Sequence, residues 1–206
     1  MIYNIYLNKN VKVFNLSIYI LTGQIGAGKS EAQKIFQNFN YSCFCADNIV
    51  RDLYKKDNII KKIQKIIPES VKDGEIDTNL LREIIFTDYT VLNKVEDYIQ
   101  PHVFKEFQKI EQLYNDKIIF TVPIIKNLEI FKKFKVIYIF SREEIRRKRV
   151  ESRNYYNKKM IDNIFEYQKK IDIYEKNCDF KIDNNSTLED LKREIITIIN
   201  KIWIII

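Results

Sequence analysis

The stretch SIYILTGQIGAGKSEAQ, residues 17–33, decides the fold. An apolar run at Ile18–Leu21 leads into a turn with the pattern G-x-x-x-x-G-K-S at Gly23–Ser30, and a segment of helical character follows. This is the order of a P-loop, in which a buried strand, a glycine-rich turn and a helix N-terminus follow one another. Three of the chain's four glycines lie in this turn, so we prefer a P-loop to a chance match. The stretch predicts a nucleoside triphosphate site.

The residue types of the turn suit a phosphate group. Glycines permit backbone angles that let several N–H groups converge on one anion, and the following helix adds the positive end of its dipole. Lys29 can reach the outer phosphates, and the Ser30 hydroxyl can ligate Mg²⁺. We therefore expect ATP and Mg²⁺ as cofactors. The residues expected to hold the nucleotide are Gly23, Gln24, Ile25, Gly26, Ala27, Gly28, Lys29 and Ser30.

Length and composition favour one α/β domain with insertions. The chain has 206 residues, of which 46% are hydrophobic and 31% are charged, as in ordinary globular proteins. No apolar run approaches the ~20 residues of a membrane span, and residues 1–15 lack the pattern of a secretory signal. Cys43, Cys45 and Cys178 form no CxxC pair, which indicates reduced thiols. We expect a cytoplasmic protein that does not enter a membrane.

The net charge of +7 has two interpretations, attraction to polyanions and general composition. The lysines are spread along the chain, whereas a nucleic-acid surface usually shows a concentrated stripe. We therefore expect no nucleic-acid partner.

The apolar pattern predicts five parallel strands that alternate with helices. After the first strand, further strands are expected at residues 41–46, 117–122, 136–140 and 180–182. Helices are expected at 29–38, from 143 to about 155, at 158–176, and after a cap at Ser186 or Thr187. Ligands collect at the carboxyl ends of parallel strands, so we expect the site there.

A helical insertion separates the second and third strands. Apolar residues recur at helical spacing between residues 49 and 115. The pattern predicts an end at Pro68, a turn at 72–75, helices at 79–86 and 91–114, and a kink or helix start at Pro101. The insertion is much longer than an ordinary crossover, so we expect a subdomain that holds the second substrate.

Asp47 ends the second strand, on the edge where the phosphates would lie. Phosphoryl transfer to a hydroxyl needs a group that orients the nucleophile and accepts its proton, and kinases use an aspartate. The alternative is that Asp47 caps the helix that starts near Asn48. The third strand ends at Pro123 without an acidic residue, which argues against a motor or switch NTPase and favours a small-molecule kinase.

Arg146, Arg149 and Arg153 fall at i, i+3 and i+7, on one face of the predicted helix from residue 143. Guanidinium groups on a mobile helix could close over ATP and neutralise charge on the transferring group. The alternative is a solvated basic helix whose arginines pair with nearby glutamates.

The whole set resembles the dephospho-coenzyme A kinase family over roughly residues 17–194. LTGQIGAGKS resembles the family's LTGGIGSGKS, Cys45-Ala46-Asp47 resembles its Asp-Ala-Asp, and DGEIDTNLLREIIF resembles its coenzyme-binding insertion. TVPIIKN resembles its Val-Pro-Leu-Leu segment followed by Glu, and CDFKIDN resembles Ala-Asp-x-x-Ile-Asp-Asn. Arg149 and Arg153 match two lid arginines, and Gln168 matches a glutamine after the lid.

The resemblance implies ATP-dependent phosphorylation of the 3′-hydroxyl of dephospho-coenzyme A, the last step of coenzyme A biosynthesis. Its catalytic residues would be Asp47, Lys29, Arg149 and Arg153, with Asn184 on the nucleotide and Ser30 on the metal. The implied acceptor-binding residues are Asp47, Arg82, Pro101, Pro123 and Gln168.

The resemblance also implies a P-loop kinase fold with a five-stranded parallel sheet, a helical substrate-binding insertion and a helical lid. The expected parts are an extension at 1–15, a core at 16–48, 116–142 and 177–206, an insertion at 49–115 and a lid with its following helix at 143–176. We expect a monomer or weak oligomer.

Four positions depart from the family pattern, and they concern the acceptor more than ATP. Cys45 replaces the first aspartate, Gln100 stands where the family has His before Pro101, Asn127 replaces a glutamate and Tyr174 replaces a basic residue. Three alternatives stay open: a kinase for another small molecule, a nucleic-acid-associated NTPase, and a protein that binds nucleotide without turnover.

Overall fold

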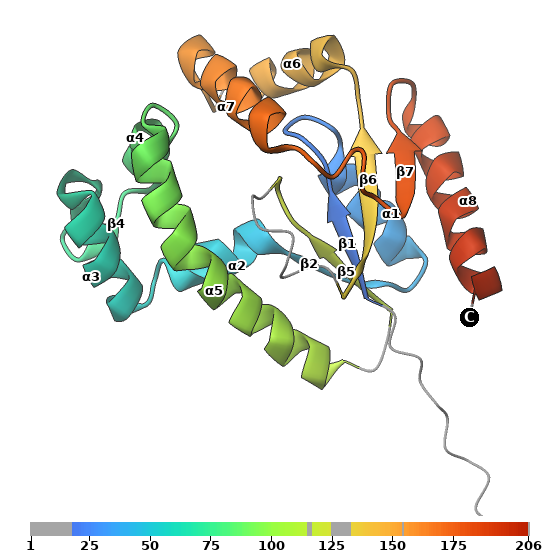
Figure 1. The fold of residues 1–206 in the computed structure, drawn as a ribbon, viewed down its shortest axis with the longest axis horizontal. Helices are drawn as coiled ribbons and strands as arrows, with labels where there is room; N and C mark the ends of the chain where they lie inside the picture. The colour runs from blue at the N-terminus through green and yellow to red at the C-terminus, as the bar shows by residue number, and fades with distance from the viewer. Residues whose placement is uncertain (1–17, 115–116, 125–132, 154, 206) are drawn as a thin grey trace, which may run out of the picture.

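The computed structural model describes residues 18–114, 117–124, 133–153 and 155–205, with side chains as far as residue 202. Figure 1 shows a central parallel sheet with helices on both faces. Its strands lie in the order β2-β5-β1-β6-β7. Their bounds are Ile18–Thr22 (β1), Ser42–Cys45 (β2), Ile118–Thr121 (β5), Lys135–Phe140 (β6) and Phe180–Asp183 (β7). The five predicted parallel strands are confirmed.

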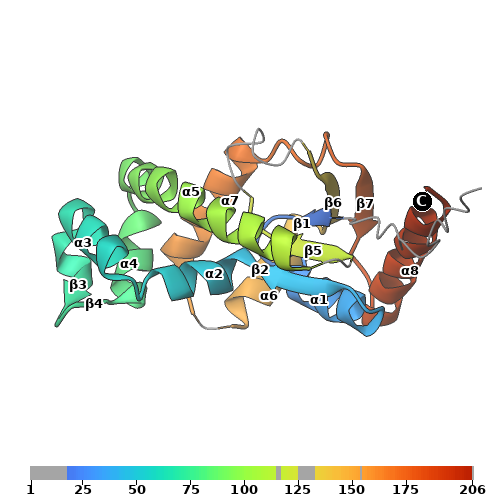
Figure 2. The same cartoon turned by 90° about the horizontal axis from the view of Figure 1, so that it is seen from below.

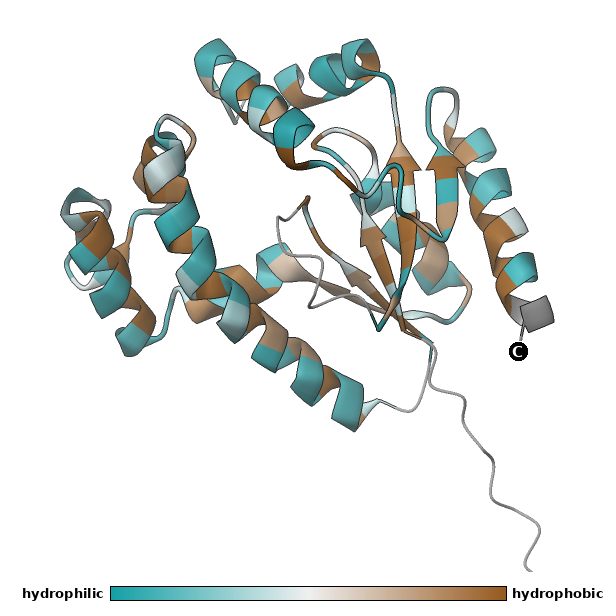
Figure 3. Cartoon of the chain, viewed as in Figure 1, coloured by the Kyte–Doolittle hydropathy of each residue, from teal (hydrophilic) through white to brown (hydrophobic). Residues whose placement is uncertain are grey.

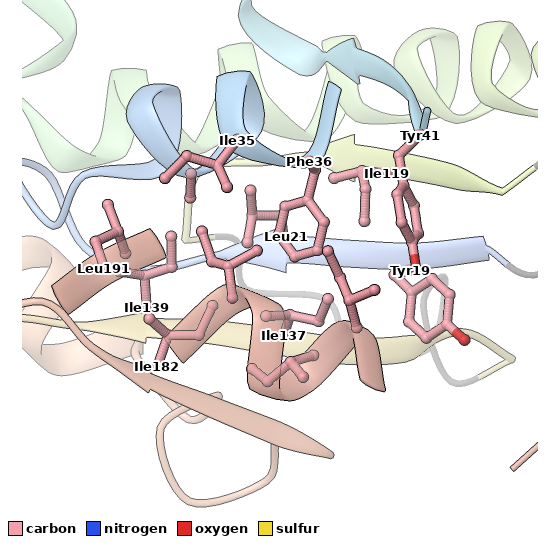
Figure 4. Close-up of a cluster of buried hydrophobic side chains, with 14 of the residues drawn as sticks. Tyr19, Leu21, Ile35, Phe36, Tyr41, Ile119, Ile137, Ile139, Ile182 and Leu191 are labelled. Atoms are coloured by element: carbon pink, nitrogen blue, oxygen red, sulfur yellow. The ribbon is translucent and has the colours of Figure 1, made fainter. Parts of the chain in front are cut away.

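Residues of β1 alternate between two hydrophobic cores because successive side chains of a strand point to opposite faces. Tyr19 and Leu21 pack with α1 (Lys29–Asn38) and α8 (Leu188–Ile205), as Figure 4 shows for this core. Ile20 packs on the other face, with Phe120 and with Phe107 from helix α5 (Tyr89–Leu113). The brown strands of Figure 3 show how apolar this layer is, and the outer faces of the helices are teal. The central strand therefore holds the glycine-rich turn at its carboxyl end on a rigid base.

The insertion forms a third hydrophobic core at the end of the molecule opposite α8 (Figures 1 and 2). It consists of α2 (Ala46–Leu53), α3 (Asp57–Ile66), a 3-10 turn (Pro68–Ser70), β3 (Val71–Lys72), β4 (Glu75–Ile76), α4 (Thr78–Ile85) and α5 (Tyr89–Leu113). Asp77 and Asp88 cap α4 and α5 by accepting bonds from backbone N–H groups. The expectation of a helical insertion holds, but it missed the β3–β4 hairpin. The predicted turn is its tip, where Asp73 and Gly74 have φ of 51° and 79°.

Of the two alternatives predicted for Pro101, a kink or a helix start, the helix start is wrong, because Pro101 lies inside α5. Proline removes one hydrogen bond from a helix interior and costs ~3 kcal/mol. Buried Val95 and Ile99 before it and buried Phe107 after it belong to one helix, so packing holds the helix through the proline.

Two further helices, α6 (Glu143–Glu151) and α7 (Lys158–Ile171), end earlier than predicted. The chain leaves α7 at Asp172, whose carboxylate accepts a bond from the Tyr174 N–H, and Tyr174 is then fully buried beside the sheet. That burial requires a turn where the sequence pattern suggested more helix. The cap at Thr187 is confirmed: its hydroxyl accepts from the Asp190 N–H, and its own N–H donates to the Asp190 carboxylate. Among the described helices, none has the length and apolar character that crossing a membrane requires.

Candidate active site

The glycine-rich turn between β1 and α1 has the shape of an anion cradle. Gly23, Gly26 and Gly28 have φ of 151°, 78° and 105°, values that favour glycine. A Cβ on Gly26 would lie 2.6 Å from the Arg146 carbonyl oxygen, and one on Gly28 would overlap the Asn184 amide. Gly28 is also the N-cap of α1, so no side chain covers the unpaired N–H groups of the first helical turn. The turn therefore fits the phosphates of a nucleotide.

Lys29 reaches back over this turn. Its Nζ donates to the Gly23 carbonyl at 2.6 Å and to the Gln24 carbonyl at 3.3 Å. Burial lowers the pKa of Lys29 from 10.5 to about 8, while the charges of Asp47 and Cys45 oppose the shift and Arg153 adds to it. Lys29 is therefore a desolvated cation that a phosphate would stabilise.

Helices α6 and α7 hold the outer side of the turn. Arg146 is 7% exposed and donates from Nη1 to the Ile25 carbonyl at 3.3 Å. The Ile25 N–H in turn donates to Gln168 Oε1 at 2.7 Å. Gln24 Nε2 donates to Asp172 Oδ2 at 2.8 Å, which also accepts from the Tyr138 hydroxyl at 2.5 Å. The structure thus makes Arg146 a buried support of the turn, whereas the sequence placed it with Arg149 and Arg153 on a helix face that could close over ATP. The structure also adds Asp172, which sequence analysis missed.

Arg149 lies against the turn and the end of β7. It donates to the Gly26 carbonyl at 3.3 Å and to the Asn184 carbonyl at 3.2 Å, and burial lowers its pKa. Asn184 is buried and donates from Nδ2 to the Ala27 carbonyl at 2.7 Å. Arg153 is exposed, and its charge affects the pKa of both Lys29 and Arg149. Three cations therefore gather around the phosphate cradle.

Arg147, the remaining arginine of α6, fits the alternative of a solvated basic helix. It pairs with Glu143 at 2.8 Å and with Asp162 at 2.6 Å. Its guanidinium also lies 4.4 Å from the centre of the Phe165 ring. Arg147 therefore fixes α6 to α7.

Asp47 is the second residue of α2, which follows β2 directly, and its side chain is exposed. Cys45, not Asp47, is the N-cap of this helix, so the alternative role of Asp47 as a cap is wrong. The charge of Asp47 raises the pKa of Lys29 against the effect of burial, as expected of groups on one edge of the sheet. Asp47 therefore lies near enough to Lys29 for its negative charge to act on the ammonium group.

An apolar cavity of about 230 Å³ opens beside Asp47, between α2, α5 and the end of β5. Pro123 lines it, as predicted for an acceptor residue, together with four side chains that carry polar groups, Asp47, Tyr54, Glu96 and Gln100. Pro101 is exposed and does not line this cavity, and its neighbour Gln100 does. Because Asp47 lines this cavity and its charge acts on Lys29 of the cradle, the cavity can hold a second substrate.

Other predicted acceptor residues lie elsewhere. Arg82 is exposed on α4 and lines a separate polar cavity of about 460 Å³ that Lys72 and Asn157 also line. Gln168 contacts the glycine-rich turn. Of the departures from the family pattern, Cys45 ends β2, Tyr174 is buried beside the sheet, and Asn127 lies outside the described residues.

The groups near the cradle fit a magnesium ion held with a nucleotide. The Ser30 hydroxyl lies in the first turn of α1, next to Lys29 of the glycine-rich turn. The described part of the chain contains no group of three or more His, Cys, Asp or Glu residues that could hold a metal ion by themselves. Magnesium in nucleotide sites usually needs only one or two protein oxygens, with water and phosphate supplying the rest.

Comparison with known proteins identifies the family. A family model described as dephospho-CoA kinase matches residues 17–190. The chain belongs to the dephospho-CoA kinase family. A dephospho-CoA kinase of Fusobacterium nucleatum is 30% identical over 185 residues, which cover 88% of this chain and 96% of the relative. One of Aquifex aeolicus is 26% identical over 85% of this chain and 92% of its own length. Dephospho-CoA kinases transfer phosphate to a hydroxyl, so the protein is an enzyme of that kind.

Solved structures confirm the fold. A dephospho-CoA kinase from Campylobacter jejuni superposes with a TM-score of 0.62 at 23% identity, covering 90% of this chain and 96% of that one. A shikimate kinase from Acinetobacter baumannii has a TM-score of 0.56 at 15% identity, covering 91% and 94%. The P-loop kinase fold expected from the sequence is therefore confirmed.

Proposed function

We propose that the protein transfers the γ-phosphoryl group of ATP to the 3′-hydroxyl of dephospho-CoA. One observation carries the proposal: Asp47 lines the acceptor cavity and interacts electrostatically with Lys29 of the phosphate cradle. A hydroxyl bound beside Asp47 would therefore lie next to a phosphate bound at Lys29.

The nucleotide would occupy the cradle from Gly23 to Ser30. Its triphosphate would meet the loop N–H groups and displace Lys29 from the carbonyls that it now contacts. Asn184 and Arg149 would support the nucleotide from the end of β7 and from α6. Magnesium, held by Ser30, would neutralise phosphate charge when bound.

In the transfer step, Asp47 would accept the proton of the acceptor hydroxyl. The hydroxyl oxygen would form a bond to the γ-phosphorus, and the bond from that phosphorus to the bridging oxygen would break, so that ADP leaves with the electron pair. Lys29, Arg149 and Arg153 would stabilise the charge on the phosphoryl oxygens. The products are coenzyme A and ADP.

On the acceptor side, the apolar cavity, with polar groups at Glu96 and Gln100, would hold the part of the acceptor that adjoins its reacting hydroxyl. Arg82 lies farther out on α4, where it could meet an anionic part of the molecule. Pro101 does not line the cavity, so it would act through the placement of its neighbour Gln100, which does. We further propose a cytoplasmic enzyme that acts as a monomer or weak oligomer without a nucleic-acid partner.

The test is incubation of the protein with ATP, Mg²⁺ and dephospho-CoA, followed by mass spectrometry of the products. We expect coenzyme A, with one phosphate on the 3′-oxygen, and an equal amount of ADP. A matched reaction with an acceptor that lacks the 3′-hydroxyl should form no phosphorylated product. Turnover of other hydroxyl-bearing metabolites, with dephospho-CoA unchanged, would overturn the proposal.

A further inference from the structure

Helix α7 contacts both halves of the active site through adjacent residues. Figure 1 shows it in orange, running from the side of the insertion towards the carboxyl end of the sheet. Tyr167 belongs to the hydrophobic core of the insertion, whereas Gln168 contacts the glycine-rich turn. Tyr167, on the acceptor side, and Gln168, on the nucleotide side, are therefore neighbours in the sequence.

On the acceptor side, Tyr167 is 7% exposed and its hydroxyl donates to Glu96 Oε2 at 2.9 Å. Glu96 lines the acceptor cavity. The Tyr167 ring stacks on Tyr89, with 5.1 Å between the ring centres. If Glu96 changes position, either the Tyr167 hydroxyl moves with it or the hydrogen bond between the two side chains breaks.

On the nucleotide side, Gln168 Oε1 accepts the Ile25 N–H at 2.7 Å. One helical turn later, Asp172 accepts from Gln24 at 2.8 Å. Two successive residues of the turn, Gln24 and Ile25, are thus held by Gln168 of α7 and by Asp172, the residue that directly follows this helix.

We propose that Tyr167 and Gln168 are positioning residues that couple acceptor binding to nucleotide binding. This inference rests on the proposed function, because it requires dephospho-CoA to occupy the cavity beside Asp47. An acceptor in that cavity fixes Glu96, Glu96 fixes Tyr167, and Gln168 then holds Ile25 and the turn in the arrangement that receives the phosphates. Each ligand must therefore favour the other by the same factor, because coupling of binding equilibria is reciprocal.

The experiment measures binding of a non-hydrolysable ATP analogue by calorimetry, with and without saturating dephospho-CoA. For the unaltered protein we expect dephospho-CoA to tighten nucleotide binding by roughly 5- to 150-fold, the usual range of coupling between sites. Tyr167→Phe keeps the buried ring and removes the bond to Glu96. The factor by which dephospho-CoA tightens nucleotide binding should therefore fall close to 1, while nucleotide binding without acceptor changes little. Gln168→Met should also lose the coupling.

Tyr89→Phe is the matched control. The Tyr89 hydroxyl also joins α5 to α7, through a bond to the Asn163 carbonyl at 2.9 Å, and Tyr89 does not line the acceptor cavity. This variant should keep the coupling. If Tyr89→Phe and Tyr167→Phe lose it equally, general docking of α7 carries the effect and the assignment to Tyr167 is overturned.

The inference is also overturned if the unaltered protein binds both ligands independently, or if Tyr167→Phe couples them normally. Failure of the proposed function is distinguishable, since dephospho-CoA would then neither bind nor be phosphorylated under any of these conditions.

Discussion

Burial sets the charge state of Lys29, and with it the affinity of the cradle for phosphate. The ammonium group donates to two backbone carbonyls of the turn, and burial brings its pKa down to about 8. The motif predicts the position of Lys29 from sequence, but its desolvation depends on the closure of the turn by α6 and α7. Arg146 illustrates the same limit, since its partner Ile25 is 121 residues away in the sequence. The spacing of the arginines assigned Arg146 to the same helix face as Arg149 and Arg153. Only the packed structure shows that Arg146 is buried and supports the turn.

The first prediction concerns pH. Phosphate binds the charged form of Lys29, so its pKa in the complex is higher than the value of about 8 in the free protein. Between these two values nucleotide binding takes up a proton, and affinity should therefore fall as pH rises above about 8, by up to tenfold per unit. Titrations of an ATP analogue from pH 7 to pH 9.5 measure this. Lys29→Ala should bind more weakly and lose this dependence; a variant that keeps the same pH profile would show that another group titrates.

At the scale of elements, α6 and α7 form one unit that supports the turn from outside. The sequence predicts both helices but extends α7 beyond its end at Ile171, because the pattern cannot show that Tyr174 is buried beside the sheet. It likewise misses the β3–β4 hairpin, whose strands of two residues are too short for an alternating pattern. The acceptor cavity could not be predicted either, since its walls come from elements far apart in the chain.

The second prediction concerns the arginines of this unit. Arg149 already contacts the turn through Gly26, and we expect it to stabilise the transferring phosphoryl group. Arg149→Ala should lower kcat by roughly 10²-fold, the scale of one preorganised electrostatic contact, and change ATP affinity much less. Steady-state kinetics with varied ATP separates the two effects, and Arg153→Ala should act in the same direction.

Lys148→Ala is the control for this comparison, because Lys148 is exposed on the same helix and its substitution removes the same charge. It should keep normal kcat. Equal losses in the Lys148 and Arg149 variants would instead indicate that α6 acts only through its overall charge.

At the scale of the whole molecule, the insertion has a hydrophobic core of its own. Its fully buried members differ from those of the two cores beside the sheet, and Ile49, Val103 and Ile171 pack against both this core and the core around Ile20. The helical character and extra length of the insertion are predictable from the spacing of residues 49–115. We propose that the insertion holds the acceptor, because α2 and α5 form a cavity with Pro123.

The third prediction concerns the hydrophobic core of the insertion. Ile63 is 0% exposed in the core of the insertion, and Ile63→Ala should destabilise the protein by about 2–5 kcal/mol through the lost contacts and the cavity that remains. Because the cradle lies on the sheet, nucleotide affinity should change little while the KM for dephospho-CoA rises. Chemical denaturation and binding titrations test this together. An equal loss of affinity for both ligands would show that the insertion supports the cradle as well.

The measurement that tests the central claim most directly compares turnover and melting temperature of Asp47→Asn with those of the unaltered protein. Asparagine keeps the size of the side chain but cannot accept the proton of the acceptor hydroxyl. We expect kcat with dephospho-CoA to fall by about 10²- to 10⁴-fold, the usual contribution of a positioned base, while the melting temperature and ATP affinity change little. Normal turnover by Asp47→Asn, or a loss explained by its unfolding, would contradict the role of Asp47 and the proposed mechanism.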